Sequence, residues 1–111
     1  MGAARHFELS AGEGSQGRSP LEAHEAFMMR GLGLVRQTIQ SPDVASLTIT
    51  LPPAGSDHDA WRRALAGDLA REYTPKRVNI AAGKEGKALD TILAYLRDAP
   101  GVTGQYIQAH D

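Results

Sequence analysis

Four strand-like segments alternate with three helix-like segments along this chain of 111 residues. Each strand-like segment is short and alternates apolar with polar residues, while each helix-like segment places apolar residues three and four positions apart. Two strands joined by a helix run in the same direction, because the helix carries the chain back to the end where the first strand began. The chain is therefore predicted to be an α/β protein with a small four-stranded parallel sheet, in the order β-α-β-α-β-α-β.

The alternation is clearest in the second strand-like segment. Leu47, Ile49 and Leu51 share one face of it, and Thr48 and Thr50 share the other. A strand with this pattern has one buried face and one polar face. The four strands are expected at residues 5–10, 46–51, 77–82 and 102–108.

A capping box predicts where the first helix begins, with Ser19 at the N-cap, Pro20 at the first helical position and Glu22 completing the box. Before it, residues 11–19 form a Gly-rich stretch that is expected to be a flexible loop. The apolar residues expected on the buried side of this helix, which would end near Gln40, are Phe27, Met28, Gly31, Leu34, Val35 and Ile39. The other two helices are expected from an N-cap at Ser56 to near Tyr73, with Trp61, Ala64, Leu65 and Leu69 inward, and from near Glu85 to Arg97.

The hand of the connections constrains where the helices lie. Strand-helix-strand connections are almost always right-handed, so four strands arranged in chain order would carry all their helices on the same face. We therefore expect a Rossmann-like half with helices mainly on one face and a second face that is polar or shared. An open face and two open edges favour association with a second copy or another protein. The alternative is a monomer whose open face is solvated.

Composition narrows the classes of partner. The net charge is −1 and basic residues are interleaved with acidic ones, so neither nucleic acid nor an anionic membrane is an expected partner. The chain has no cysteine, which excludes disulfides and thiolate metal sites. No apolar run approaches the roughly 18 residues of a spanning helix. A single domain over residues 1–111 and a cytoplasmic location are expected.

Three strings in the last third of the chain resemble a known family. Leu69-Ala70-Arg71-Glu72 is followed by Arg77-Val78-Asn79, and Val102-Thr103-Gly104-Gln105 comes one helix later. These strings resemble the C-terminal half of a short-chain dehydrogenase/reductase. The resemblance implies a Rossmann-like doubly wound sheet. It also implies that this half carries the substrate side of the family's pocket and much of its oligomer interface.

The motifs that make such a protein an enzyme are missing. Counting back from Leu69 places Gly55 and Asp59 where the family has its catalytic Tyr-x-x-x-Lys pair, so the family's proton transfer has no donor. Neither Gly12 nor Gly31 begins a Gly-rich fingerprint with the family's spacing, and no nicotinamide cofactor is expected. The sequence predicts no catalytic residue and no cofactor-binding residue.

Two interpretations of the strand ends stay open. Open α/β sheets bind ligands beyond the carboxyl ends of their strands. A small-molecule crevice there would be edged by Asn79, Gly83, Lys84 and Thr103. The competing and favoured interpretation is that these residues only shape the loops. No metal site is predicted, because the residues 57–59 point in different directions on a helix and are better explained by helix capping.

These observations favour a non-enzyme over an enzyme. The expected protein is a non-catalytic Rossmann-like protein that acts as a homodimer or as an accessory subunit of another protein. The alternative is a small enzyme or a small-molecule-binding module that uses the crevice, completed across a dimer. A remnant with a purely structural role is not distinguished from the first hypothesis by sequence.

Overall fold

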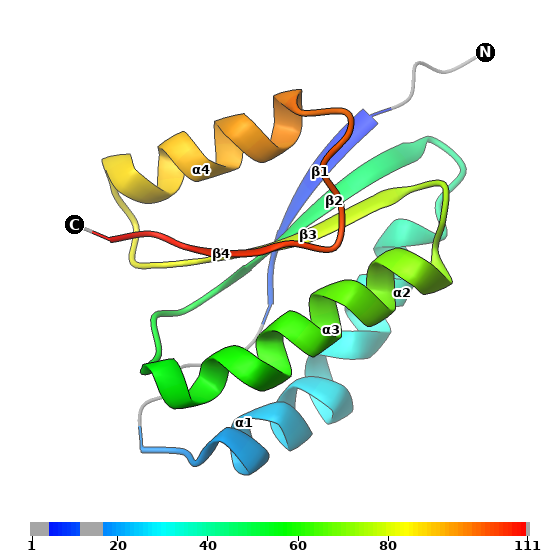
Figure 1. The fold of residues 1–111 in the computed structure, drawn as a ribbon. Coiled ribbons are helices and arrows are strands. Elements are labelled where there is room, and N and C mark those ends of the chain that lie inside the picture. Colours follow the sequence, from blue (N-terminus) through cyan, green and yellow to red (C-terminus); the bar gives the residue numbers. More distant parts are fainter. Residues whose placement is uncertain (1–4, 12–16, 111) are drawn as a thin grey trace.

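The sheet contains four parallel strands in the order β1-β2-β3-β4, as predicted (Figure 1). The computed structural model describes residues 5–11 and 17–110. Residues 12–16 of the loop expected to be flexible lie outside the described part, whereas Ala11 at its start is buried. The strands are β1 (Arg5–Ser10), β2 (Val44–Leu51), β3 (Arg77–Ala82) and β4 (Tyr106–Gln108).

The first helical segment consists of α1 (Pro20–Ala26), the π-helical turn η1 (Phe27–Gly31) and α2 (Leu32–Ile39). Its predicted capping box is confirmed: the Ser19 amide donates to Glu22 Oε1 at 2.9 Å, and the Glu22 amide donates to Ser19 Oγ at 3.1 Å. The remaining helices are the 3₁₀ turn η2 (Ser56–His58), α3 (Asp59–Glu72) and α4 (Lys87–Asp98). The expected N-cap at Ser56 is wrong, because Gly55 and His58 occupy the cap positions.

The π-helical turn changes which residues of the first helix face the sheet. The buried residues Ala23, Phe27, Gly31, Val35 and Ile39 recur every four residues. In an α-helix each step of four residues rotates the side chain by about 40°, and a turn with one extra residue absorbs part of that drift.

The prediction that Met28 and Leu34 are buried is consequently wrong, since each is 45% exposed. Ala64 of α3 is also exposed rather than buried, and Arg62 takes the place expected for an apolar residue on the inner side. The spacing of apolar residues by three and four positions predicted the helices correctly. It placed the exposed residues Met28, Leu34 and Ala64 on the buried face, an error of less than one helical turn.

The helices lie on both faces of the sheet (Figure 1). One core joins α1–α2 and α3 to one face of β2 and β3, through residues such as Val35, Leu69 and Ile49. A second core joins α4 to the other face, through Leu89, Leu96 and Ala81 of β3. The expectation that helices lie mainly on one face holds for α1–α2 and α3, but the inference that all of them share it is wrong for α4.

The connection through α4 is left-handed. Because the strands advance across the sheet in one direction, connections whose helices lie on opposite faces have opposite hands. The connections through α1–α2 and α3 have the usual right hand, and the one from β3 to β4 does not. Something other than strand twist must hold α4 in place.

The polar face of the strands is partly covered by α4 rather than open. Ser46 and Thr48 on this face are buried. His6 Nδ1 lies 2.6 Å from Ser46 Oγ, and His6 Nε2 lies 3.4 Å from Thr48 Oγ1, so the buried hydroxyls have hydrogen-bond partners. The alternation in the sequence therefore marks a covered face whose polar groups are satisfied.

We predict opposite effects for two glycines that are two residues apart. A Cβ at Gly31 would lie 3.0 Å from the Phe27 ring, whereas a Cβ at Gly33 would meet nothing within 4 Å. Gly31→Val should destabilise the fold by about 1–3 kcal/mol through overpacking. Gly33→Ala should stabilise it by about 0.5–1 kcal/mol, because alanine is the better helix former.

Urea denaturation of both variants beside the wild type tests this pair. Equal effects of the two substitutions would contradict the packing of Phe27 against the π-helical turn.

Candidate functional site

The side chain of Arg77 holds the carboxyl end of α4. Its Nη1 donates to the carbonyl oxygens of Leu96 at 3.0 Å and Ala99 at 2.9 Å, and its Nη2 donates to that of Arg97 at 3.3 Å. The last carbonyls of a helix lack partners within the helix and carry partial negative charge, so a guanidinium both satisfies and neutralises them. Arg77 thus fixes α4 on its face of the sheet.

Asn79 and Thr103, two of the predicted crevice residues, hold the loop between α4 and β4. Asn79 is buried; its side chain donates to Val102 O and accepts from the Gln105 amide, both at 3.0 Å. Thr103 Oγ1 accepts from the Val78 amide at 3.0 Å. These bonds explain why strand β4 is shorter than predicted, because Val102 to Gln105 bond to side chains and to Val78 before regular pairing begins.

Gly83, the third predicted crevice residue, lies at the carboxyl end of β3. Its backbone φ is +154°, and a Cβ there would lie 2.7 Å from the Cβ of Ala109. Only glycine permits this close approach of the last segment of the chain. Lys84, the fourth, follows it and is exposed.

The structure therefore places the four predicted residues in two groups. Asn79 lies in the first half of β3 and Gly83 follows four positions later, which corresponds to about 13 Å along an extended strand. Of the four, Gly83 lines the pocket described next, and Asn79, Lys84 and Thr103 are not among the described residues that line it.

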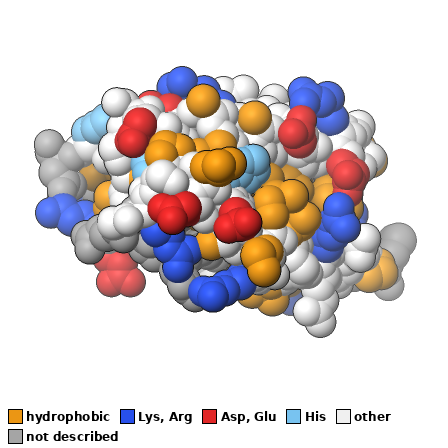
Figure 2. Space-filling model, turned by 90° about the horizontal axis from the view of Figure 1, so that it is seen from below, with side chains coloured by type: hydrophobic (Ala, Val, Ile, Leu, Met, Phe, Trp, Pro, Cys, Tyr) orange, Lys and Arg blue, Asp and Glu red, His pale blue; other side chains and the backbone are white. Residues whose placement is uncertain are grey.

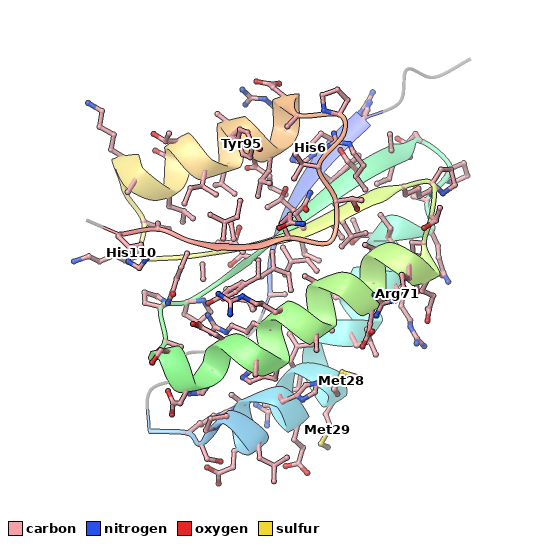
Figure 3. All side chains as sticks on the ribbon, viewed as in Figure 1. His6, Met28, Met29, Arg71, Tyr95 and His110 are labelled. Carbon is pink, nitrogen blue, oxygen red and sulfur yellow. The ribbon has the colours of Figure 1, made fainter. Side chains whose placement is uncertain are left out.

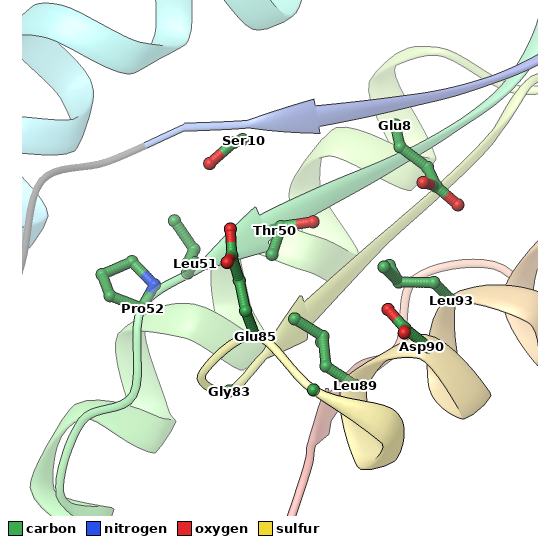
Figure 4. Close-up of a pocket in the computed structure, with 11 residues that line it drawn as sticks. Glu8, Ser10, Thr50, Leu51, Pro52, Gly83, Glu85, Leu89, Asp90 and Leu93 are labelled. Carbon is green, nitrogen blue, oxygen red and sulfur yellow. The ribbon is translucent and has the colours of Figure 1, made fainter.

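That site is a pocket of about 620 Å³ at the carboxyl ends of the strands (Figure 4). It lies on the α4 face, where α4 leaves the ends of β1 and β2 uncovered. Its apolar wall comes from Leu51, Leu89 and Leu93, and hydroxyls come from Ser10 and Thr50. The carboxylates that line it belong to Glu8, Glu85 and Asp90.

The charge of this pocket selects against anions. Among the described residues, three carboxylates and no lysine or arginine line it, so phosphate groups would be repelled and cations attracted. Within residues 5–11 and 17–110, no group of three His, Asp or Glu side chains is arranged to hold a metal ion. The chemistry the pocket offers is recognition of a small organic cation with an apolar body.

Sequence reasoning found the end of β3 but missed the acidic residues of the pocket. Glu8 and Thr50 share the polar face of neighbouring strands, which their alternation indicates. Glu85 and Asp90 come from the turn after β3 and from α4. The sequence prediction placed α4 on the other face of the sheet. With α4 there, Glu85 and Asp90 would lie on the face away from Glu8, so a pocket shared by the three carboxylates was not predicted.

His6 lies on the same sheet face as Glu8. Burial lowers its pKa below the usual value, although Glu8 opposes the shift. The imidazole is therefore neutral at pH 7 and bonds to Ser46 as a structural group.

The start of α3 has none of the chemistry of a Tyr/Lys pair. Gly55 precedes the η2 turn, and Asp59 is the first residue of α3. His58 is buried and accepts a hydrogen bond from Trp61 Nε1 at 3.2 Å, so the residues 57–59 do not form a triad. The prediction that capping explains these residues is not supported by a side-chain bond at η2 or at the start of α3.

Arg62, which sequence reasoning missed, is the largest of the fully buried side chains, with 1% exposure. Its Nη1 donates to the Tyr106 hydroxyl at 3.2 Å, and its guanidinium lies 5.5 Å and 5.8 Å from the ring centroids of Trp61 and Tyr106. These contacts join α3 to the edge strand β4. The sequence does contain a signal for the burial of Arg62: it lies three residues before Leu65, which places it on the same buried face of α3.

The parallel sheet, the helices on both faces and the pocket at the strand ends define a Rossmann-like α/β protein. The chain belongs to the SDR-like family, whose model, described as short chain dehydrogenase-like protein, matches residues 14–109. No curated protein and no solved structure matches the chain. In the part of the chain that the structure describes, no helix has the length and apolar character needed to cross a membrane.

We predict that Asn79→Ala destabilises the fold by about 2–3 kcal/mol, because the Gln105 amide loses its partner in a buried setting. Gln105→Ala is the matched control, since its side chain is exposed in the same loop and its removal should change stability by less than about 0.5 kcal/mol. Chemical denaturation measures both. A loss below about 0.5 kcal/mol for Asn79→Ala would remove its proposed structural role.

Proposed function

We propose that this chain is a non-catalytic member of the SDR-like family that acts through protein association, by self-association or as an accessory subunit. One observation carries the proposal: large apolar side chains are exposed together on the helix layer that covers the first sheet face. A cytoplasmic location belongs to the same proposal and is supported by the absence of cysteine.

The exposed apolar residues of α1, η1 and α2 form what we term the helix-layer patch. It comprises Leu21, Met28, Met29 and Leu34, with Met29 77% exposed. Met29 points away from the sheet (Figure 3), and Figure 2 shows apolar side chains gathered on the face formed by the helices. The π-helical turn contributes to the patch, because Met28 and Met29 lie within it.

A shallow apolar groove of about 130 Å³ continues the patch between α1–α2 and α3. Met28, Leu32 and Leu69 are among its lining residues. Exposed apolar clusters of this kind are typical of protein interaction sites, and methionine side chains adapt to the shape of a partner.

Charges of both signs border the groove. Arg36 Nη2 lies 3.8 Å from Glu72 Oε2, and Asp68 lines the same groove. A mixed rim suits another folded protein with its own mixed charges. It does not suit nucleic acid or an anionic membrane, which require a basic face.

The absence of catalysis is supported by the residues at the start of α3. In the family the lysine of the Tyr/Lys pair lowers the pKa of the tyrosine by its positive charge. Here Asp59 carries the opposite charge and Gly55 has no side chain, so no proton can be transferred in that way. The acidic pocket adds to this, because it repels the phosphates of a nicotinamide cofactor.

We predict that Met29→Glu weakens association at least about ten-fold while the fold is retained, because a charge replaces an exposed apolar contact. Tyr95→Glu is the control, since Tyr95 is also an exposed apolar residue, 54% exposed, but lies on α4. Sedimentation velocity at micromolar concentrations and capture assays with wild type and variants measure the effect. A monomeric wild type that captures no partner would refute the proposal, as would equal association of wild type and Met29→Glu.

The second candidate function is a small-molecule-binding module, which the pocket beside Gly83 favours. Its ligand would be a small organic cation. Thermal shift with aliphatic diamines and arylalkylamines should raise the melting temperature of the wild type, and nucleotides and acyl-CoAs should not. Glu85→Gln with Asp90→Asn should abolish the shift, whereas Glu25→Gln on α1, outside the pocket, should preserve it. A flat response to all amines would exclude this function.

A further inference from the structure

The outer edge of β1 is open in the structure. Among residues 5–11 and 17–110, no strand pairs with β1 on the side away from β2. Natural edge strands are protected by shortness, lysine, proline or bulges. The opposite edge strand β4 has three residues, whereas β1 has six and contains neither lysine nor proline. Its irregularity lies between Arg5 and His6, which leaves His6 to Ser10 regular.

The backbone groups that face this open edge can be assigned. The Ala11 amide donates to Thr50 O of β2 at 3.1 Å. Backbone groups alternate in direction along a strand, so the amides of Phe7 and Leu9 also point toward β2. The amides and carbonyls of His6 and Glu8 therefore point outward, where they lack a strand partner among the described residues.

We infer that two copies of this chain pair through β1 in antiparallel fashion and form one continuous eight-stranded sheet. The inference rests on the proposed function, because the pairing is a form of self-association. It assigns the open edge of β1 to that association, in addition to the helix-layer patch. A two-fold axis perpendicular to the sheet keeps the two faces of each copy on the same side. Two residues that lie directly opposite each other, one from each copy, must then be on the same face of β1, so their residue numbers differ by zero or an even number.

Charge excludes one of the registers that this symmetry permits. If Glu8 lay opposite its own copy, two like charges would face each other, which destabilises a sheet. If Phe7 lies on the axis, His6 of each copy lies opposite Glu8 of the other. This register places each Glu8 carboxylate opposite the neutral His6 imidazole of the other copy and exchanges four backbone hydrogen bonds between His6 and Glu8.

The apolar face of β1 supports the same register. Phe7 and Leu9 are only partly buried within one copy, although they pack against its core. In the inferred pairing the two Phe7 rings meet on the axis as a non-hydrogen-bonded pair, in which the side chains approach most closely. The second copy therefore completes the burial of the apolar edge.

The first test uses a single cysteine, because the chain contains none. Phe7→Cys places one thiol of each copy on the axis, where the two sulfurs are within reach of a disulfide, and oxidation should yield a covalent dimer. Leu9→Cys is the matched control on the same face, and it lies about 13 Å from its counterpart in this register. Cross-linking of Leu9→Cys in preference to Phe7→Cys, or of neither, would overturn the inference.

The second test removes a backbone donor. Glu8→Pro deletes an outward amide without touching the β1–β2 ladder, and should raise the dimer dissociation constant at least ten-fold in sedimentation equilibrium. Glu8→Ala keeps the amide and should raise it only a few-fold. Circular dichroism confirms that each variant is folded.

The outcomes also separate this inference from the proposed function. A dimer that survives Glu8→Pro, fails to cross-link through Phe7→Cys and dissociates on Met29→Glu would overturn the β1 pairing and leave the proposed function standing. A wild type that is monomeric at 100 micromolar, about the highest concentration an assay of this kind needs, would overturn the β1 pairing. Capture of a specific partner by that monomer would still preserve an accessory role.

Discussion

Two consecutive basic residues, Lys76 directly before β3 and Arg77 at its start, hold helices on both faces of the sheet. Lys76 Nζ donates to the carbonyl oxygens of Ile39, the last residue of α2, at 2.6 Å and of Ser41 at 2.9 Å. Arg77 donates to the last carbonyls of α4. Lys76 directly precedes the strand and Arg77 is its first residue, and their side chains reach the carboxyl ends of two helices on opposite faces of the sheet.

The left-handed connection depends on this arrangement. Strand twist disfavours it, and the bonds of Arg77 and Asn79 to the end of α4 and the following loop compensate for that cost. Once α4 lies on the second face, it covers the polar groups of β2 and leaves the ends of β1 and β2 to line the acidic pocket. The edge of β1 away from β2 then has no strand partner in the described part of the chain.

The elements could be predicted from sequence because their signals are local. The capping box of Ser19 and Glu22 and the alternation in Leu47–Leu51 involve residues within a few positions of each other. The face of α4 could not be predicted, because it is decided by bonds between Arg77 and residues about twenty positions away. The same holds for the site: Gly83 was predicted from its place at a strand end, but Glu8 joins Glu85 and Asp90 only once α4 is placed.

The strings that resemble the family, Arg77-Val78-Asn79 and Val102-Thr103-Gly104-Gln105, make contacts that stabilise the fold and have no part in hydride transfer. In Arg-Val-Asn, Arg77 binds the end of α4, Val78 is buried in the core and Asn79 binds the loop before β4. In Val-Thr-Gly-Gln, Thr103 and Gly104 return hydrogen bonds to Val78. Substitution of Asn79 or Thr103 removes a hydrogen-bond partner from the other string, so both strings stabilise the fold whether or not a Tyr/Lys pair is present. Family membership without the catalytic pair is therefore consistent with a protein whose retained property is its scaffold.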